Sequence, residues 1–156
     1  MSLIETVVIG AKATTLVSAI GTDVLIGTVT TTTTSIINMI GYLTTNTQPG
    51  INDILNTIKK IDLEFTVNII EQLVKEQEGK MLCDSIKKAL LGVNEVLGWI
   101  HKELDSIKQA IEYHHTKYFN NWRIFVWNGN ISIIQTYNDI LKNRYSILFE
   151  LLKIKI

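Results

Sequence analysis

Hydrophobic residues recur at helical spacing through the middle of the chain, and this is the clearest pattern in the sequence. After the break at Pro49-Gly50, an apolar residue returns every three or four positions. These positions are Ile51, Ile54, Ile58, Ile61, Phe65, Ile69 and Leu73. Polar residues fill most of the positions between them, so the pattern predicts an amphipathic helix with one buried face. Gly79 suits a left-handed C-terminal cap and predicts where this helix ends.

A second, longer run begins near Asp84 or Ser85, either of which is a suitable N-cap. Its apolar positions alternate steps of four and three over more than four heptads, as in the seam of a coiled coil. They are Ile86, Leu90, Val93, Leu97, Ile100, Leu104, Ile107, Ile111, His114 and Tyr118. Two long helices joined by a short turn most simply pack antiparallel. Residues 49–118 are therefore predicted to form a long antiparallel helical hairpin, although the same seam would also serve between two copies of the chain.

The first 48 residues are almost free of charge. Their charged residues are Glu5, Lys12 and Asp23. Steps of three and four occur at Ile4, Val8, Ala11 and Thr15. Such spacing favours helix, whereas the density of Val and Thr favours strand. We expect residues 1–48 to be an apolar N-terminal arm or helical hairpin, with helix as the preferred conformation.

A segment with so few polar side chains needs to be shielded from water by another part of the chain, another protein or lipid. The two apolar blocks, residues 3–20 and 24–42, are each close to the length of about 20 residues that crosses a bilayer. Glu5, Lys12 and Asn38, however, are costly in hydrocarbon. Three interpretations stay open: a buried layer of the core or a subunit interface, which we favour, contact with a membrane, and a lipid-free insertion arm.

The last third of the chain, residues 119–156, contains a turn signal followed by a helical pattern. Asn128-Gly129 lies between Arg123–Trp127 and Asn130–Ile134, and Asn-Gly accepts the positive φ angles of a type I′ turn. We therefore expect a small β-hairpin there. Apolar residues at helical spacing then predict a C-terminal helix over about Thr136–Lys153. The predicted fold is mainly α, and its three stretches form one folded unit.

An aromatic cluster is the strongest candidate for an interaction site. The candidate residues are Tyr118, Phe119, Trp122, Arg123, Phe125 and Trp127. The same residue types serve as protein-interface anchors, as membrane-interface belts, and as stacking platforms for single-stranded bases. The 15 basic residues are balanced by 15 acidic ones, so the chain lacks the surplus that nucleic-acid binding requires. Packing of the cluster against the long helices is the simplest alternative to an interface.

The sequence offers little chemistry for catalysis. Glu112 and His115 form the Glu-x-x-His pair of di-iron bundles, but such bundles need that pair twice. Cys83 is the single cysteine, so it forms no intramolecular disulfide, which favours a reducing compartment, and zinc sites need more such ligands. The sequence contains no nucleophile elbow and no P-loop. We expect no enzyme activity, metal, cofactor or small-molecule substrate.

Residues 100–123, with the sequence IHKELDSIKQAIEYHHTKYFNNWR, resemble small helical proteins of large DNA viruses with AT-rich genomes. The resemblance implies a structural or accessory virion protein and assigns no functional residue. The demand for a covered surface and the lack of catalytic motifs favour the same class. We therefore expect a non-enzymatic helical structural or assembly protein that binds other protein subunits, either copies of itself or others. The alternative is a membrane-inserting or membrane-anchored protein that uses residues 3–43.

Overall fold

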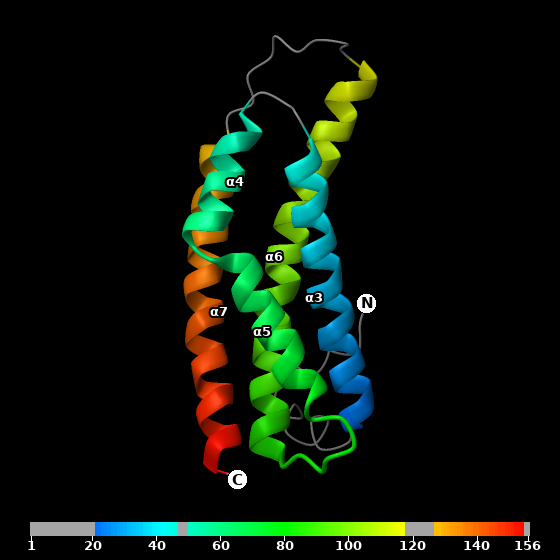
Figure 1. Ribbon diagram of the computed structural model, residues 1–156, viewed down its shortest axis with the longest axis vertical. Coiled ribbons are helices and arrows are strands. Elements are labelled where there is room, and N and C mark those ends of the chain that lie inside the picture. The colour runs from blue at the N-terminus through cyan, green and yellow to red at the C-terminus, as the bar shows by residue number, and fades with distance from the viewer. Residues whose placement is uncertain (1–20, 47–49, 118–126, 155–156) are drawn as a thin grey trace, which may run out of the picture.

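The computed structural model describes residues 21–46, 50–117 and 127–154, and these residues form helices joined by short connections (Figure 1). The helices are α3 (Thr22–Thr45), α4 (Ile51–Lys60), α5 (Leu63–Lys75), α6 (Asp84–Lys117) and α7 (Asn128–Ile154). Within these ranges there is no β-strand. The prediction of a mainly α fold is confirmed.

The helices lie side by side along the long axis as an up-and-down bundle (Figure 1). α3 runs up, α4 and α5 follow one another down, α6 runs up and α7 runs down. α6 approaches α7 and α3 most closely, while α5 approaches α3 most closely. The two predicted central segments do run in opposite directions on either side of Gly79, which has a φ of 76°. They do not form a self-contained hairpin, because each has a closer neighbour elsewhere in the bundle.

The predicted seam of α6 forms the centre of the core. Every apolar position of that seam from Ile86 to Ile111 is buried. Leu91 and Val96 are buried beside the seam, so the covered face of α6 is wider than the seam of a two-stranded coiled coil. Fully burying one such side chain contributes about 1.5–3 kcal/mol. The width of this face explains how α6 packs against both α7 and α3.

The helix expected after Pro49 is broken into α4 and α5 at Ile61-Asp62. Asp62 takes a left-handed conformation with φ 58° and ψ 38°, which Asp tolerates better than most residues. The Asn138 side chain of α7 donates a hydrogen bond to the Ile61 carbonyl at 3.4 Å. The break turns a different face of α5 inward, so Phe65 and Ile69 are 60% and 38% exposed instead of buried. The buried positions of α5 are Leu63, Val67, Ile70 and Val74.

The predicted β-hairpin around Asn128-Gly129 is wrong. These two residues start α7, and the Ile131 amide donates to the Trp127 carbonyl at 2.8 Å, which is a helical hydrogen bond. The helix covers Asn130–Ile134, the expected second strand, while residues 123–126 lie outside the described part. Helical spacing lets Ile134 and Leu141 enter the core together, and this burial outweighs the local turn preference of Asn-Gly. The C-terminal helix is confirmed, but it begins at Asn128 and not near Thr136.

Candidate interaction surface

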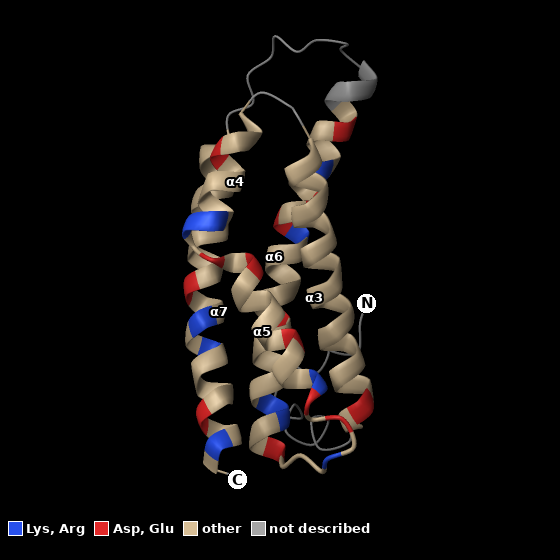
Figure 2. Cartoon of the chain, in the orientation of Figure 1, with Lys and Arg blue, Asp and Glu red and all other residues tan. Residues whose placement is uncertain are grey.

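Helix α3 has no charged residue after Asp23, and Figure 2 shows it uncoloured along almost its whole length. Of the described helices, it is the one long and apolar enough to cross a membrane, judged by length and composition. About a third of this apolar stretch is buried inside the bundle. One side of α3 therefore packs in the core, and the other side presents a surface that has no charge after Asp23.

The inner face of α3 belongs to the hydrophobic core. Its buried apolar residues are Leu25, Ile26, Val29, Ile36, Ile40 and Leu43. α6 and α5 are the two helices that α3 approaches most closely. If α3 left the bundle, the residues that it covers on those two helices would be exposed to water, so α3 is an integral part of the fold.

We call the opposite side the outer face of α3. Its exposed residues are Val24, Gly27, Thr31, Thr34, Asn38, Gly41 and Thr45, which follow one another at steps of three and four. Asp23, at the start of the helix, is exposed on the same side, but none of the residues from Val24 onward is charged and most are small. A Cβ atom added at Gly27 or Gly41 would meet nothing within 4 Å, so space over this face is open. Small residues at this spacing let another helix approach closely.

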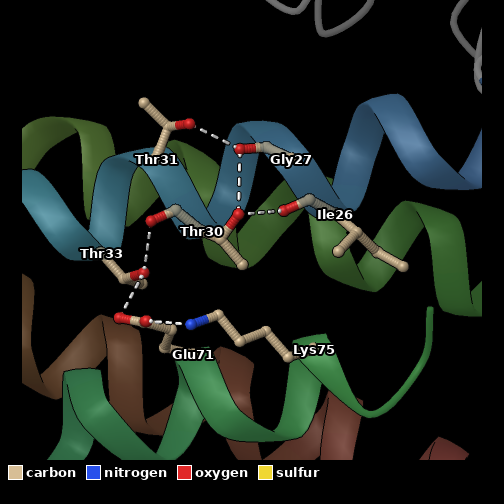
Figure 3. Close-up of polar contacts among 7 residues, drawn as sticks. All are labelled: Ile26, Gly27, Thr30, Thr31, Thr33, Glu71 and Lys75. Atoms are coloured by element: carbon tan, nitrogen blue, oxygen red, sulfur yellow. Dashed lines mark hydrogen bonds and ion pairs between the residues drawn. The ribbon is translucent and has the colours of Figure 1, made fainter.

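The threonine hydroxyls of α3 are hydrogen-bonded within their own helix. Thr31 donates to the Gly27 carbonyl at 2.8 Å, and Thr30 lies between the carbonyls of Ile26 and Gly27 (Figure 3). Thr28, Thr32 and Thr44 make the same kind of bond to the carbonyl four residues earlier. Since each hydroxyl has a single proton, these groups have no donor left for water. On the outer face, the hydroxyls of Thr31 and Thr45 therefore offer water acceptor positions but no free donor.

A polar contact between α3 and α5 fixes how α3 is rotated. Thr33 is fully buried, and its Oγ1 lies 3.2 Å from Oε2 of Glu71, while Oε1 of Glu71 accepts from Nζ of Lys75 at 2.7 Å (Figure 3). The Thr33 hydroxyl also lies 2.9 Å from the Thr30 carbonyl, so its one proton is shared between two acceptors. This contact holds the inner face of α3 against α5 and leaves the outer face pointing away.

A second contact joins the C-terminal part of α3 to α6. The ammonium of Lys108 lies 5.1 Å from the centre of the Tyr42 ring, in a cation–π arrangement. Burial raises the pKa of Tyr42, the carboxylate of Glu112 raises it further, and a hydrogen bond with Asn46 opposes the rise. Tyr42 therefore stays neutral at physiological pH and packs as part of the α3–α6 contact.

The aromatic cluster chosen from sequence falls mostly outside the described residues. Tyr118, Phe119, Trp122, Arg123 and Phe125 all lie there. Trp127 is described, and it is 7% exposed and part of the hydrophobic core. This burial fits the packing alternative for Trp127. The outer face of α3 was not singled out from sequence, although the unbroken steps of small uncharged residues from Gly27 to Thr45 were the signal for it.

The described residues were also compared with the arrangement that a metal ion requires. No group of three or more His, Cys, Asp and Glu side chains lies close enough together there to hold a metal ion. Cys83 lies before α6 with its Sγ 3.1 Å from the hydroxyl of Ser85. A hollow of about 310 Å³ lies between the ends of α5 and α7, and its walls include Leu73, Phe149 and Leu152. The walls also include the polar side chains of Glu76, Gln77, Lys80 and Lys153.

Comparison with known proteins gives a similarity to a viral protein. A 90-residue part of the chain is 30% identical to "Uncharacterized protein L717" of Acanthamoeba polyphaga mimivirus. The chain is similar to a protein of a large DNA virus. The match covers 58% of this chain and 42% of the mimivirus protein, so the chain spans less than half of that relative's length. No protein-family description matches the sequence, and no solved structure matches it.

Proposed function

We propose that this protein is a non-enzymatic helical assembly protein that binds other protein subunits through an uncharged flank. We define the uncharged flank as the outer face of α3 from Val24 to Thr45. The observation that carries the proposal is the outer face of α3, which has no charge after Asp23, two open glycines, and the Thr31 and Thr45 hydroxyls bonded within the helix. A surface of this kind gains more from another protein than from water.

The similarity to a mimivirus protein supports placing this assembly role in a virus, among the structural or accessory proteins of a virion. This similarity identifies no partner. The proposal therefore concerns the class of partner, protein subunits, and leaves self-assembly and assembly with another protein as its two forms.

A membrane-inserting or membrane-anchored protein is the second candidate, because α3 has the length and composition of a membrane span. The buried inner face argues against it. Insertion of α3 alone would remove Ile36 and Leu43 from the core and break the contact between Thr33 and Glu71. An assembly role keeps the bundle intact.

The test is the molar mass of the full chain in solution, measured by light scattering with and without mild detergent. We expect a mass above that of one chain, or exposed apolar surface detected by dye binding, and detergent should lower either signal. The variant Thr31→Lys/Asn38→Lys should lower it as well, because lysines on the outer face must be desolvated on assembly. Ser106→Lys/Ser132→Lys, at exposed positions of α6 and α7, is the matched control.

Two results would contradict the proposal. The first is a single chain at all concentrations that binds no dye and ignores detergent. The second is flotation of the full chain with liposomes that the outer-face lysines abolish and the control lysines do not, which would favour the membrane candidate.

A further inference from the structure

We propose that a second copy of this chain packs antiparallel against the side of the bundle that α6 and α7 form together. The surface consists of a row of apolar residues on α7 and the charged residues of α6 beside it. This surface is separate from the outer face of α3, so its role goes beyond the proposed function and is tested independently of it.

Helix α7 carries two rows of apolar residues. One row, which includes Ile134, Leu141 and Leu148, is buried in the core. The other row, which we call the second seam, alternates steps of four and three along the helix. Its members are Ile133, Tyr137, Ile140, Arg144, Ile147, Leu151 and Ile154. This spacing is typical of a helix face that packs against another helix over several turns.

The bundle covers the second seam only in part. Ile133, Ile147 and Ile154 are 39%, 53% and 80% exposed, and with Ile140 they place an isoleucine at every seventh position. α7 lies along one edge of the bundle, where α6 is its closest neighbour (Figure 1). Covering these side chains with a further helix would remove apolar surface from water and is therefore favourable.

Arg144 is the one charged member of the second seam, and its head group is held by α6. Its Nη1 donates to the Gly92 carbonyl at 2.8 Å and lies 3.0 Å from Oε1 of Glu95. Its Cζ lies 5.4 Å from the centre of the Trp99 ring. Since the guanidinium is directed to α6, Arg144 contributes the hydrocarbon part of its side chain to the seam.

The side of α6 next to the second seam carries charges of alternating sign. Glu95 is placed there by its ion pair with Arg144. Lys88 and Lys102 lie seven residues before and after Glu95, so they project from the same side of α6, and both are exposed. Two copies that pair antiparallel can place Lys88 of each copy opposite Glu95 of the other. A parallel pairing in register would instead place like charges opposite each other.

The same antiparallel pairing suits the second seam. The midpoint between the two paired charges of α6 lies next to Gly92, whose carbonyl contacts Arg144 of α7. Antiparallel pairing about that point brings Ile140 near Leu151 of the second copy, and Ile147 near the hydrocarbon part of Arg144. The charges of α6 and the apolar residues of α7 therefore favour the same orientation.

The two helices together offer enough area for a dimer. Each helix is about 10 Å across, and an overlap of about 18 residues is about 27 Å long. The pair thus presents about 540 Å² on each copy, or about 1,100 Å² on two copies. An interface between proteins should bury at least about 1,000 Å² in total. α7 alone would offer half of this area, so the dimer needs α6 as well.

A second copy fits this surface better than a lipid bilayer does. In a bilayer, Lys88, Glu95 and Lys102 would lose water without gaining new partners. In an antiparallel second copy, charges of alternating sign meet opposite charges. A two-fold dimer uses the same patch on both copies, and a patch that complements itself meets this requirement.

The first test is the molar mass of the full chain in a Thr31→Lys/Asn38→Lys background, which removes assembly through the outer face of α3. Sedimentation equilibrium should give twice the mass of one chain. Ile147→Lys should raise the dissociation constant of this dimer at least about tenfold, because the lysine must be desolvated. Ser146→Lys is the matched control, because this neighbouring residue points about 100° away from Ile147.

Three results of this test would overturn the inference. One is the mass of a single chain at all concentrations, and another is a dimer that Ile147→Lys weakens no more than Ser146→Lys does. The third is flotation of the chain with liposomes that Ile147→Lys abolishes, which would make a membrane the occupant. In each case the proposed function would stand, because it is tested by the lysines on α3.

The second test exchanges charges to identify the occupant as a second copy. Lys88→Glu and Glu95→Lys should each weaken the dimer, because each places like charges opposite each other. An equimolar mixture of the two variants restores opposite charges, so at low salt the mixed dimer should form at least about fivefold more tightly than either variant with itself. Absence of this recovery on mixing would overturn the inference.

Circular dichroism checks that both variants are folded, because Glu95→Lys also removes the ion pair with Arg144. If Glu95→Lys does not fold, Lys88→Gln takes its place in the comparison. Lys88→Glu should then weaken the dimer more than Lys88→Gln, because only the glutamate repels Glu95 of the second copy. Equal dissociation constants for these two variants would also overturn the inference.

Discussion

Helices α3 and α7 lie on opposite sides of α6, and both bury one face in the core, yet their outward sides are built differently (Figure 2). On its exposed side α7 carries the charged residues Asp139, Lys142, Glu150 and Lys153 between apolar ones such as Ile147 and Phe149. On its outer face α3 carries no charge after Asp23, and most of the residues there are small. Inner faces alone would suggest the same role for both helices. Packing in the core does not determine which residues lie on the outward side of a helix. The comparison therefore indicates that binding partners should be inferred from the outward sides.

The largest expected effect tests whether the two inner faces are equivalent. Ile36 of α3 and Leu148 of α7 are both fully buried. Replacing either by Ala removes buried methyl groups and leaves a cavity, so each variant should lower the free energy of unfolding by about 2–5 kcal/mol. Urea denaturation followed by circular dichroism measures both. A loss below about 1 kcal/mol for Ile36→Ala alone would mean that α3 is not a core helix.

The next effect concerns the polar contact that orients α3. Thr33→Val keeps the side-chain shape but removes the hydroxyl beside Glu71, and should lower the free energy of unfolding by about 1–2 kcal/mol. Thr31→Val is the matched control. Its hydroxyl bonds only to its own helix on the outer face, so its effect should stay within about 0.5 kcal/mol. Similar losses in the two variants would show that the contact with Glu71 does not hold α3 in place.

A smaller effect on stability separates the two outward sides. Thr34→Lys on α3 and Ser146→Lys on α7 both add a charge at an exposed position, so each should change the free energy of unfolding by no more than about 0.5 kcal/mol. The molar mass or dye binding of the full chain should respond only to Thr34→Lys. If both variants changed these signals equally, the contrast between the two outward sides would have no bearing on assembly.

The smallest effect appears at alkaline pH and compares Tyr42 of α3 with Tyr145 of α7. Burial raises both pKa values, and Glu112 adds to the rise at Tyr42. The unfolded chain ionises near pH 10 while the folded chain keeps neutral phenols, so stability is complete below about pH 10 and falls as the pH rises above it. Tyr42→Phe and Tyr145→Phe should each reduce this fall, measured by urea denaturation at about pH 8 and about pH 10.5. An unchanged fall in either variant would contradict burial as its cause.

Long-range periodicity made much of this fold predictable. The seam from Ile86 to Ile111 extends over several heptads, and every one of its positions is buried. The C-terminal helix was predictable for the same reason. The low charge content of the N-terminal third also predicted a surface that is shielded from water. This prediction needs only the composition of the segment and not its conformation.

The errors arose where a local signal competed with tertiary packing. Asn128-Gly129 favours a turn in isolation, but Ile134 and Leu141 reach the core only if the chain is already helical there. The break at Asp62 had no strong marker, since residues on either side fit one continuous helix equally well. The outer face of α3 was missed because apolar periodicity identifies buried faces, and an exposed face without charge is recognised only after its buried side is known.

The left-handed residue at Asp62 has a consequence for how this chain tolerates change. A continuous helix turns by about 100° for every added residue, so an insertion rotates everything that follows it. Neither helix continues through Asp62, so the directions in which the side chains of α4 and of α5 point are set independently. One extra residue at that point can be taken up by the turn, so Ile54 and Ile58 of α4 and Val67 and Ile70 of α5 should all keep facing the core. An extra residue inside α5, in contrast, should rotate the rest of α5 by about 100° and leave α4 unchanged.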